Sequence, residues 1–181
     1  CGTNLSAAWK GFNEFRKLDL ISELPKMVGI QAEGACPVVS AFNSGKSRPD
    51  CVSKPISVAG AICVGDPLDG ELVLGALYDS GGTAISVSDY ELLEAEKLLA
   101  KKESIFVEPA SASTLAALIK MVGSGEVSKG ETVVLIATGV GLKDPVSALR
   151  VLHTPPTTEP VLSDVEKFLK YSYYDVHATA A

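Results

Sequence analysis

The chain has 181 residues, 46% of them hydrophobic and 21% charged, a balance typical of one α/β domain with a sizeable core. Its 16 basic and 22 acidic residues give a net charge of −6, which argues against nucleic acid or an anionic membrane as a main partner. No apolar run approaches the roughly 20 residues that cross a bilayer, and the four cysteines lack the Cys-x-x-Cys spacing of a zinc site. We therefore expect no metal, and free thiols in a cytoplasmic protein.

The first part of the chain predicts a helix, a strand, a second helix and a loop. Apolar residues recur at helical spacing over 4–18, with Asn4 as the expected N-cap. The short apolar segment 27–31 predicts a buried strand, and 35–42 a short helix. Dense turn and charge signals then predict an exposed loop over 43–55.

The next elements are a helix over 68–79 that ends at Gly81-Gly82 and a strand over 83–87. Ser88 and Glu91 have the spacing of a capping box, which opens a helix through about residue 101.

Three further segments follow before the pattern weakens at Pro145. Residues 105–107 are expected to be extended, and 111–122 are apolar nearly all round, which predicts a buried helix packed on a sheet. The β-branched run 132–137 predicts a strand covered on both faces. Strands alternate with helices, so we predict an α/β fold with a doubly wound, mostly parallel sheet and helices on both faces.

The last 31 residues are predicted to lie outside that fold. We expect one domain over 1–150 and an extension over 151–181, with a linker at 155–160 and a short helix over 163–174. His153 and His177 fall in this extension, outside any recognisable site.

The chain opens with Gly2-Thr3-Asn4 running directly into a helix. Unpaired amides and the helix dipole make such a start a ready anion site, and a phosphate-binding loop is one interpretation. The alternative is that Gly2 only makes a turn.

Six motifs, in this order and spacing, resemble the C-terminal half of threonine synthase, a pyridoxal-phosphate (PLP) enzyme of the tryptophan-synthase-β type (fold type II). They cover about residues 1–150: Gly-Thr-Asn-Leu-Ser-Ala (2–7), Val-Gly-Ile-Gln-Ala-Glu-Gly-Ala (28–35), Val-Gly-Asp-Pro (64–67), Ser-Gly-Gly (80–82), Phe-Val-Glu-Pro-Ala-Ser-Ala (106–112) and Ala-Thr-Gly-Val-Gly-Leu-Lys-Asp-Pro (137–145). The family's Schiff-base lysine and the loop that holds the cofactor ring match nothing here. We therefore expect them upstream, in the N-terminal half of a longer enzyme.

The resemblance implies roles for residues at two motifs. Gly2, Thr3 and Asn4 would bind the cofactor phosphate, and the Thr138 hydroxyl would meet the pyridine nitrogen, where a neutral group tempers the electron sink. A simpler role for Thr138 is to cap the following turn. The sequence departs from the family at Cys1 and Thr3, where Asn and Gly are usual, and at Val140, where a polar residue is frequent.

Two glutamates and a serine are further candidates. Glu108 is a possible catalytic residue that orients substrate or relays a proton, and Glu33 is a weaker candidate, although a helix N-terminal or surface position is commoner for both. Ser111 could belong to the site or cap the helix that follows. Lys143 and Asp144 are expected to hold a turn in place.

The resemblance implies conversion of O-phospho-L-homoserine and water to L-threonine and phosphate by PLP-dependent β,γ-replacement. Cysteate synthase and threonine/serine dehydratase are alternatives within the same cofactor class, and Ser111 and Thr138 favour the synthase over the dehydratase. A non-catalytic module that binds an anion or a partner is the alternative outside it. The implied partners are a phosphorylated amino acid, the N-terminal half and a second copy in a homodimer, to which Tyr171-Ser172-Tyr173-Tyr174 could contribute.

Overall fold

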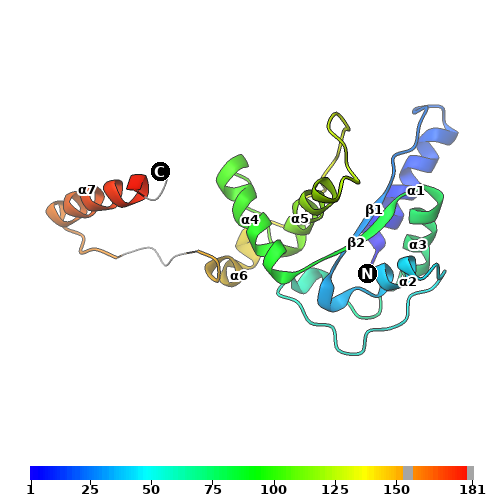
Figure 1. Ribbon diagram of the computed structural model, residues 1–181, viewed down its shortest axis with the longest axis horizontal. Coiled ribbons are helices and arrows are strands. Elements are labelled where there is room, and N and C mark those ends of the chain that lie inside the picture. The colour runs from blue at the N-terminus through cyan, green and yellow to red at the C-terminus, as the bar shows by residue number, and fades with distance from the viewer. Residues whose placement is uncertain (153–156, 179–181) are drawn as a thin grey trace. The chain divides into compact units, whose positions relative to one another are not determined.

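The computed structural model describes residues 1–152 and 157–178, with side chains placed as far as residue 170 (Figure 1). The chain divides into two compact units, Cys1–Val151 and Leu152–Ala181. The first unit contains, in chain order, α1 (Thr3–Lys17), β1 (Val28–Ala32), η1 (Glu33–Ala35), α2 (Pro37–Asn43), η2 (Gly60–Ile62), α3 (Gly70–Asp79), β2 (Thr83–Val87), α4 (Asp89–Glu103), α5 (Pro109–Ser124), η3 (Gly141–Lys143) and α6 (Pro145–Leu149).

The second unit contains helix α7 (Leu162–Ala178), which begins one residue before the predicted helix and runs beyond its predicted end. His153 and the first residues of the predicted linker lie outside the described part of the chain, as do the side chains of Tyr171, Tyr173 and His177. Among the described residues, no helix is long and apolar enough to cross a membrane.

A parallel pair of strands, β1 and β2, forms the centre of the first unit. The register pairs Val28 with Thr83 and Ala32 with Val87, so both carboxyl ends lie at the same edge. A parallel pair needs a crossover connection, which α2, a long loop and α3 supply here. This arrangement confirms the predicted α/β class with a parallel sheet.

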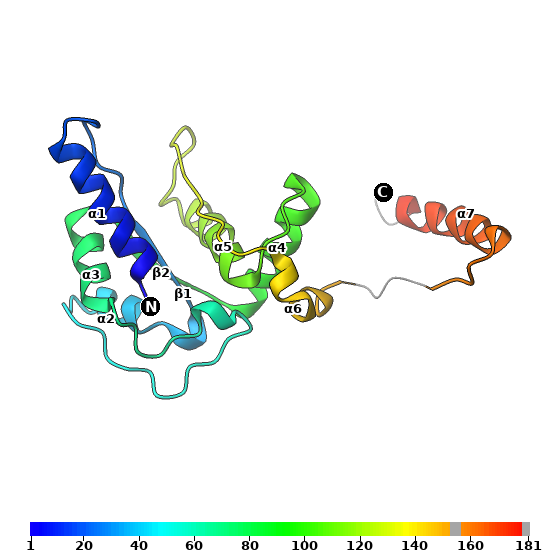
Figure 2. The ribbon, with the colours of Figure 1, turned by 180° about the vertical axis from the view of Figure 1, so that it is seen from behind.

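Helices cover both faces of this sheet. Ala84 packs with Leu74 and Leu77 of α3, and Leu5 of α1 lies against the same cluster. Figure 2 shows the strands between α1 and α3 on one side and α5 on the other. The result is three layers in the order helices, sheet, helices.

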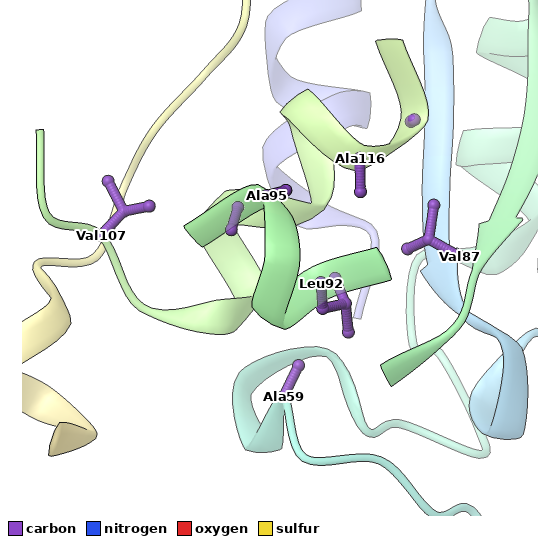
Figure 3. Packing of buried hydrophobic residues seen from close by; sticks show 8 residues of the cluster. Ala59, Val87, Leu92, Ala95, Val107 and Ala116 are labelled. Carbon is purple, nitrogen blue, oxygen red and sulfur yellow. The ribbon is translucent and has the colours of Figure 1, made fainter. Parts of the chain in front are cut away.

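The second cluster lies on the opposite face, between the sheet, α4 and α5. Val87 and Leu92 are fully buried there, and Ala116 and Ala59 pack beside them (Figure 3). Alanines supply the α5 contacts, so α4 and α5 approach closely. Helix α5 differs from the prediction on its far side, because Ile119 and Val122 are about half exposed.

The start of α4 confirms the predicted capping box. Ser88 Oγ accepts a hydrogen bond from the Glu91 amide at 3.3 Å, and the Glu91 carboxylate accepts one from the Ser88 amide at 2.7 Å. Two amides at the helix end are thus satisfied reciprocally.

The predicted strand over 132–137 is wrong for this structure. The segment is extended but forms no ladder with any described residue, and Val134 is 81% exposed. A strand requires a neighbour to accept and donate its backbone hydrogen bonds, and periodicity alone cannot supply one. The apolar side chains that we expect to be buried on both faces of a strand are therefore exposed to solvent at Val133, Val134 and Ile136.

Helix α1 also begins differently from the prediction. Gly2 takes the N-cap position with a left-handed backbone (φ +94°), and Asn4 lies inside the first turn without capping it. A Cβ on residue 2 would approach Val73 Cγ2 to 2.5 Å, so close packing on α3 favours glycine there as well.

Glu96 is a buried acid on α4 whose two carboxylate oxygens have no hydrogen-bond partner among the described residues. Burial, and secondarily the charge of Asp144, raises the pKa of Glu96 from 4.5 to about 7. The folded chain therefore holds this proton at pH values where the unfolded chain has released it. Stability from this group is complete below about pH 4.5 and is lost as the pH rises to about 7.

We expect Glu96→Gln to remove that pH dependence, because the neutral amide resembles the protonated acid. Above pH 7 the variant should raise the free energy of unfolding by about 2 kcal/mol, and near pH 4.5 the gain should vanish. Urea unfolding of the 181-residue chain between pH 4.5 and 8 measures both. Glu103→Gln, at the exposed end of the same helix, is the control; an equal effect from both variants would contradict the assignment.

Candidate functional site

Two loops that carry the last two sequence motifs lie side by side. The Glu108 amide donates to the Gly139 carbonyl at 2.9 Å, and an isolated antiparallel bridge pairs Val107 with Val140. The loop before α5 is therefore joined by its backbone to the loop after the extended segment 132–137.

Ser111, in the first turn of α5, holds the second loop through its hydroxyl. Ser111 Oγ accepts hydrogen bonds from the amides of Thr138, at 3.1 Å, and Gly139, at 2.7 Å. It also lies 3.1 Å from Thr138 Oγ1. Ser111 is 2% exposed, whereas Thr138 is exposed, so the pair is anchored at one end and open at the other.

The Glu108 side chain lies between residue 139 and Lys143. Its carboxylate is nearly buried and forms an ion pair with Lys143, at 3.2 Å between Nζ and Oε2. A Cβ on residue 139 would come within 1.9 Å of Glu108 Oε1, so the Glu108 side chain occupies its present position only beside a glycine. Glu108 is also the residue that precedes α5, although its side chain does not cap the helix.

Asp144 fixes the turn into α6. Its carboxylate accepts hydrogen bonds from the Ser147 amide at 3.1 Å and the Ser147 hydroxyl at 2.6 Å. These bonds hold the pKa of Asp144 below its ordinary value. The predicted turn role is confirmed for Asp144, while Lys143 reaches back across the site to Glu108.

The start of α1 has the backbone of an anion site. The first amide to donate within the helix is that of Ser6, to the Gly2 carbonyl at 3.1 Å, so the amides of Thr3, Asn4 and Leu5 point out of the helix end. The Cys1 carbonyl accepts from the Asp69 amide at 3.0 Å, which ties this turn to the start of α3. These outward-pointing amide donors fit a phosphate group.

The structure brings together Glu108, Ser111, Thr138 and Lys143. Among the described residues, no hydrogen bond or ion pair joins this group to Gly2, Thr3 or Asn4. Glu33 lies exposed in η1, at the end of β1, and also stands apart from the group.

Sequence reasoning missed two features of this group. Ser111 is not a cap, because Glu108 and Pro109 already occupy the helix start, and its hydroxyl serves the other loop instead. Lys143 is a partner of Glu108 and not only a turn residue. No local sequence signal marks either contact, because Ser111 and Gly139 are 28 positions apart and Glu108 and Lys143 are 35 apart.

The comparisons with known proteins agree with the sequence motifs. The family model described as "Pyridoxal-phosphate dependent enzyme" matches residues 1–139. Threonine synthase of Methanocaldococcus jannaschii is 47% identical over 167 residues, which is 92% of this chain and 41% of the relative. Threonine synthase of Methanosarcina acetivorans is 47% identical over 156 residues, covering 86% of this chain and 38% of that protein.

A solved structure, a fungal L-serine ammonia-lyase from Rhizomucor miehei, shares the fold with a TM-score of 0.58 at 14% sequence identity. It covers 78% of this chain, which in turn covers 45% of that structure. The chain thus spans about two fifths of the length of the curated relatives that it matches. From the family match and from these identities we conclude that the chain belongs to the pyridoxal-phosphate dependent enzymes.

Proposed function

We propose that this chain is the C-terminal part of a threonine synthase, which converts O-phospho-L-homoserine and water to L-threonine and phosphate. The observation that carries the proposal is the pair of adjoining loops in which Ser111 holds Thr138. The 47% identity to two archaeal threonine synthases supports the choice of substrate over cysteate synthase or a dehydratase.

In this proposal two parts of the chain hold the cofactor. The amides of Thr3 and Asn4 at the start of α1 bind its phosphate, and the Thr138 hydroxyl meets its pyridine nitrogen. PLP, when bound, supplies an electron sink for the reaction. The chain's own contribution is to bind the ring nitrogen through a neutral hydroxyl and the phosphate through helix amides.

Glu108 is proposed to orient this half of the site. Its pairing with Lys143 and its contact with residue 139 support a role in holding the Thr138 loop. A proton relay through Glu108 stays a prediction of the sequence.

The remaining partners are also proposals. The N-terminal half of the enzyme would supply the Schiff-base lysine and cover the apolar segment 132–137, where Val134 is exposed. A homodimer and a cytoplasmic location follow from the resemblance to the family.

A hybrid enzyme tests the proposed function. In it, this chain replaces the 167 residues that it matches in the Methanocaldococcus jannaschii threonine synthase. We expect PLP binding, seen as a visible absorbance band that borohydride removes, and phosphate release from O-phospho-L-homoserine. A folded hybrid that binds PLP but turns over only serine or threonine would favour a dehydratase, and one that binds no PLP would overturn the cofactor role.

Thr138→Val in that hybrid should lower kcat/KM by about tenfold to a hundredfold, because it removes one hydrogen bond to the cofactor ring without changing the side-chain shape. Thr138→Ser, which keeps the hydroxyl, should retain most activity. Thr132→Val, an identical change in the extended segment before the loop, is the control. Steady-state phosphate release measures all three, and equal losses from Thr138→Val and Thr132→Val would contradict the role of Thr138.

A further inference from the structure

The Ser111 hydroxyl oxygen lies within hydrogen-bond distance of three groups, which are the Thr138 amide, the Gly139 amide and the Thr138 hydroxyl. A serine hydroxyl accepts two hydrogen bonds through its lone pairs and donates one. The amides of Thr138 and Gly139, at 3.1 and 2.7 Å, can only donate, so they occupy both lone pairs of Ser111 Oγ.

The third contact of Ser111 Oγ, 3.1 Å from Thr138 Oγ1, then has one permitted direction. If Thr138 were the donor, Ser111 Oγ would accept three bonds and its own hydrogen would be buried without an acceptor, since Ser111 is 2% exposed. Within the described part of the chain, Ser111 Oγ has no other hydrogen-bond partner. Ser111 must therefore donate to Thr138.

The direction of this bond determines the orientation of the Thr138 hydroxyl. Its oxygen accepts from Ser111, and its own hydrogen is directed away from the buried side of the pair, toward the side that is exposed in this chain. The Thr138 hydroxyl therefore donates a hydrogen bond to any ligand atom that contacts it on this side.

We propose that Ser111 is a positioning residue that fixes Thr138 as a hydrogen-bond donor and so selects an unprotonated ring nitrogen in the bound ligand. This inference rests on the proposed function for the identity of the ligand, whereas the direction of the Ser111 hydrogen bond does not. Ser111 touches no reacting atom in this account and acts only through Thr138.

The direction of the bond can be tested in the 181-residue chain without cofactor. Ser111 should show a slowly exchanging hydroxyl proton by NMR, with a cross-peak to Thr138. In Thr138→Val that proton loses its acceptor and should exchange too fast to detect. A slowly exchanging hydroxyl proton on Thr138 instead of Ser111 would overturn the proposal.

The anchoring of the loop has its own measurement. Ser111→Ala should speed amide hydrogen exchange at Thr138 and Gly139 by about tenfold or more, because both amides lose their acceptor. Ser113→Ala is the matched control: Ser113 is also buried in α5, but its hydroxyl donates to the Ala110 carbonyl of its own helix at 2.7 Å. Unchanged exchange in Ser111→Ala, or equal changes in both variants, would overturn the anchoring role.

The effect on the ligand is read in the hybrid enzyme loaded with PLP that is ¹⁵N-labelled in the ring. The ring nitrogen should be unprotonated in the parent, and its protonated fraction at pH 7 should rise in Ser111→Ala, because the freed Thr138 hydroxyl can turn to accept. A protonated ring nitrogen in the parent hybrid would overturn the selection. If the hydroxyl and amide results hold but the hybrid binds no PLP, the proposed function fails while the Ser111 geometry stands.

Discussion

Gly82→Ala is expected to destabilise the chain by about 3 kcal/mol or more, the largest effect of any single methyl group proposed for this fold. A Cβ at this position would lie 1.9 Å from the Met27 carbonyl oxygen and 2.9 Å from the Met27 nitrogen. Both atoms are backbone, so no side chain can turn aside to make room. The strand pair would have to separate at its first bond, in which the Thr83 amide donates to Met27 at 3.1 Å.

Urea unfolding of the 181-residue chain measures this loss. Gly75→Ala is the matched control, because Gly75 lies within α3, ahead of Gly82 in the chain, and a Cβ there meets nothing within 4 Å. Replacing glycine by alanine in a helix interior should raise stability by about 0.5–1 kcal/mol. A Gly82→Ala variant as stable as the parent chain would show that β1 and β2 do not pair as described.

Gly139→Ala is also expected to have a large effect, and this one falls on the candidate site. Its Cβ would come within 1.9 Å of Glu108 Oε1 and 2.3 Å of Glu108 Cδ. The backbone at residue 139 cannot retreat easily, because its carbonyl and amide are bonded to Glu108 and Ser111. Glu108 must therefore swing out and give up its ion pair with Lys143. We expect a loss of about 2 kcal/mol in stability and about a hundredfold in kcat/KM of the hybrid enzyme.

A double-mutant cycle separates the clash from other effects of the methyl group. In a Glu108→Ala background the three nearest contacts of the new Cβ are gone, so Gly139→Ala should cost much less than it does in the parent. Gly123→Ala in α5, where a Cβ has open space, controls for the substitution itself. An equal cost of Gly139→Ala in both backgrounds would show that Glu108 does not pack against residue 139.

The elements that sequence predicts well are those determined by nearby residues. Ser88 and Glu91 specify the start of α4 by their own hydrogen bonds, and the helical spacing of apolar residues predicts that α1 is a helix. The core face that this spacing also predicts is not seen, because no residue of α1 is buried and Phe15 is half exposed. Strands β1 and β2 are bounded by turn residues and occur where predicted. Local chemistry is sufficient in each case.

Sequence prediction fails where the outcome depends on distant partners. The run 132–137 has strong β-branched character, yet no described residue pairs with its backbone. The sequence names Glu108, Ser111 and Thr138 as candidates, but it cannot show that Ser111 serves Thr138 from 27 positions away. Gly82 and Gly139 are likewise explained only by the atoms that approach them in space.

The long connection between α2 and α3 has an evolutionary consequence. It is tied at one end by the Lys46 amide, which bonds to the Ala41 carbonyl at 2.9 Å, and at the other by Asp89, whose carboxylate accepts from Ser57 at 2.6 Å and Val58 at 3.1 Å. Within this stretch the Val52 amide donates to the Gly65 carbonyl at 2.9 Å and the Ile56 amide donates to the Gly34 carbonyl at 3.1 Å. The mostly exposed backbone between Lys46 and Val52 is therefore the part that can lengthen without disturbing the register of the strands. Because each doubling of a flexible loop costs only about 0.6 kcal/mol, insertions are tolerated most readily here, where new specificity can be acquired while the sheet stays as it is.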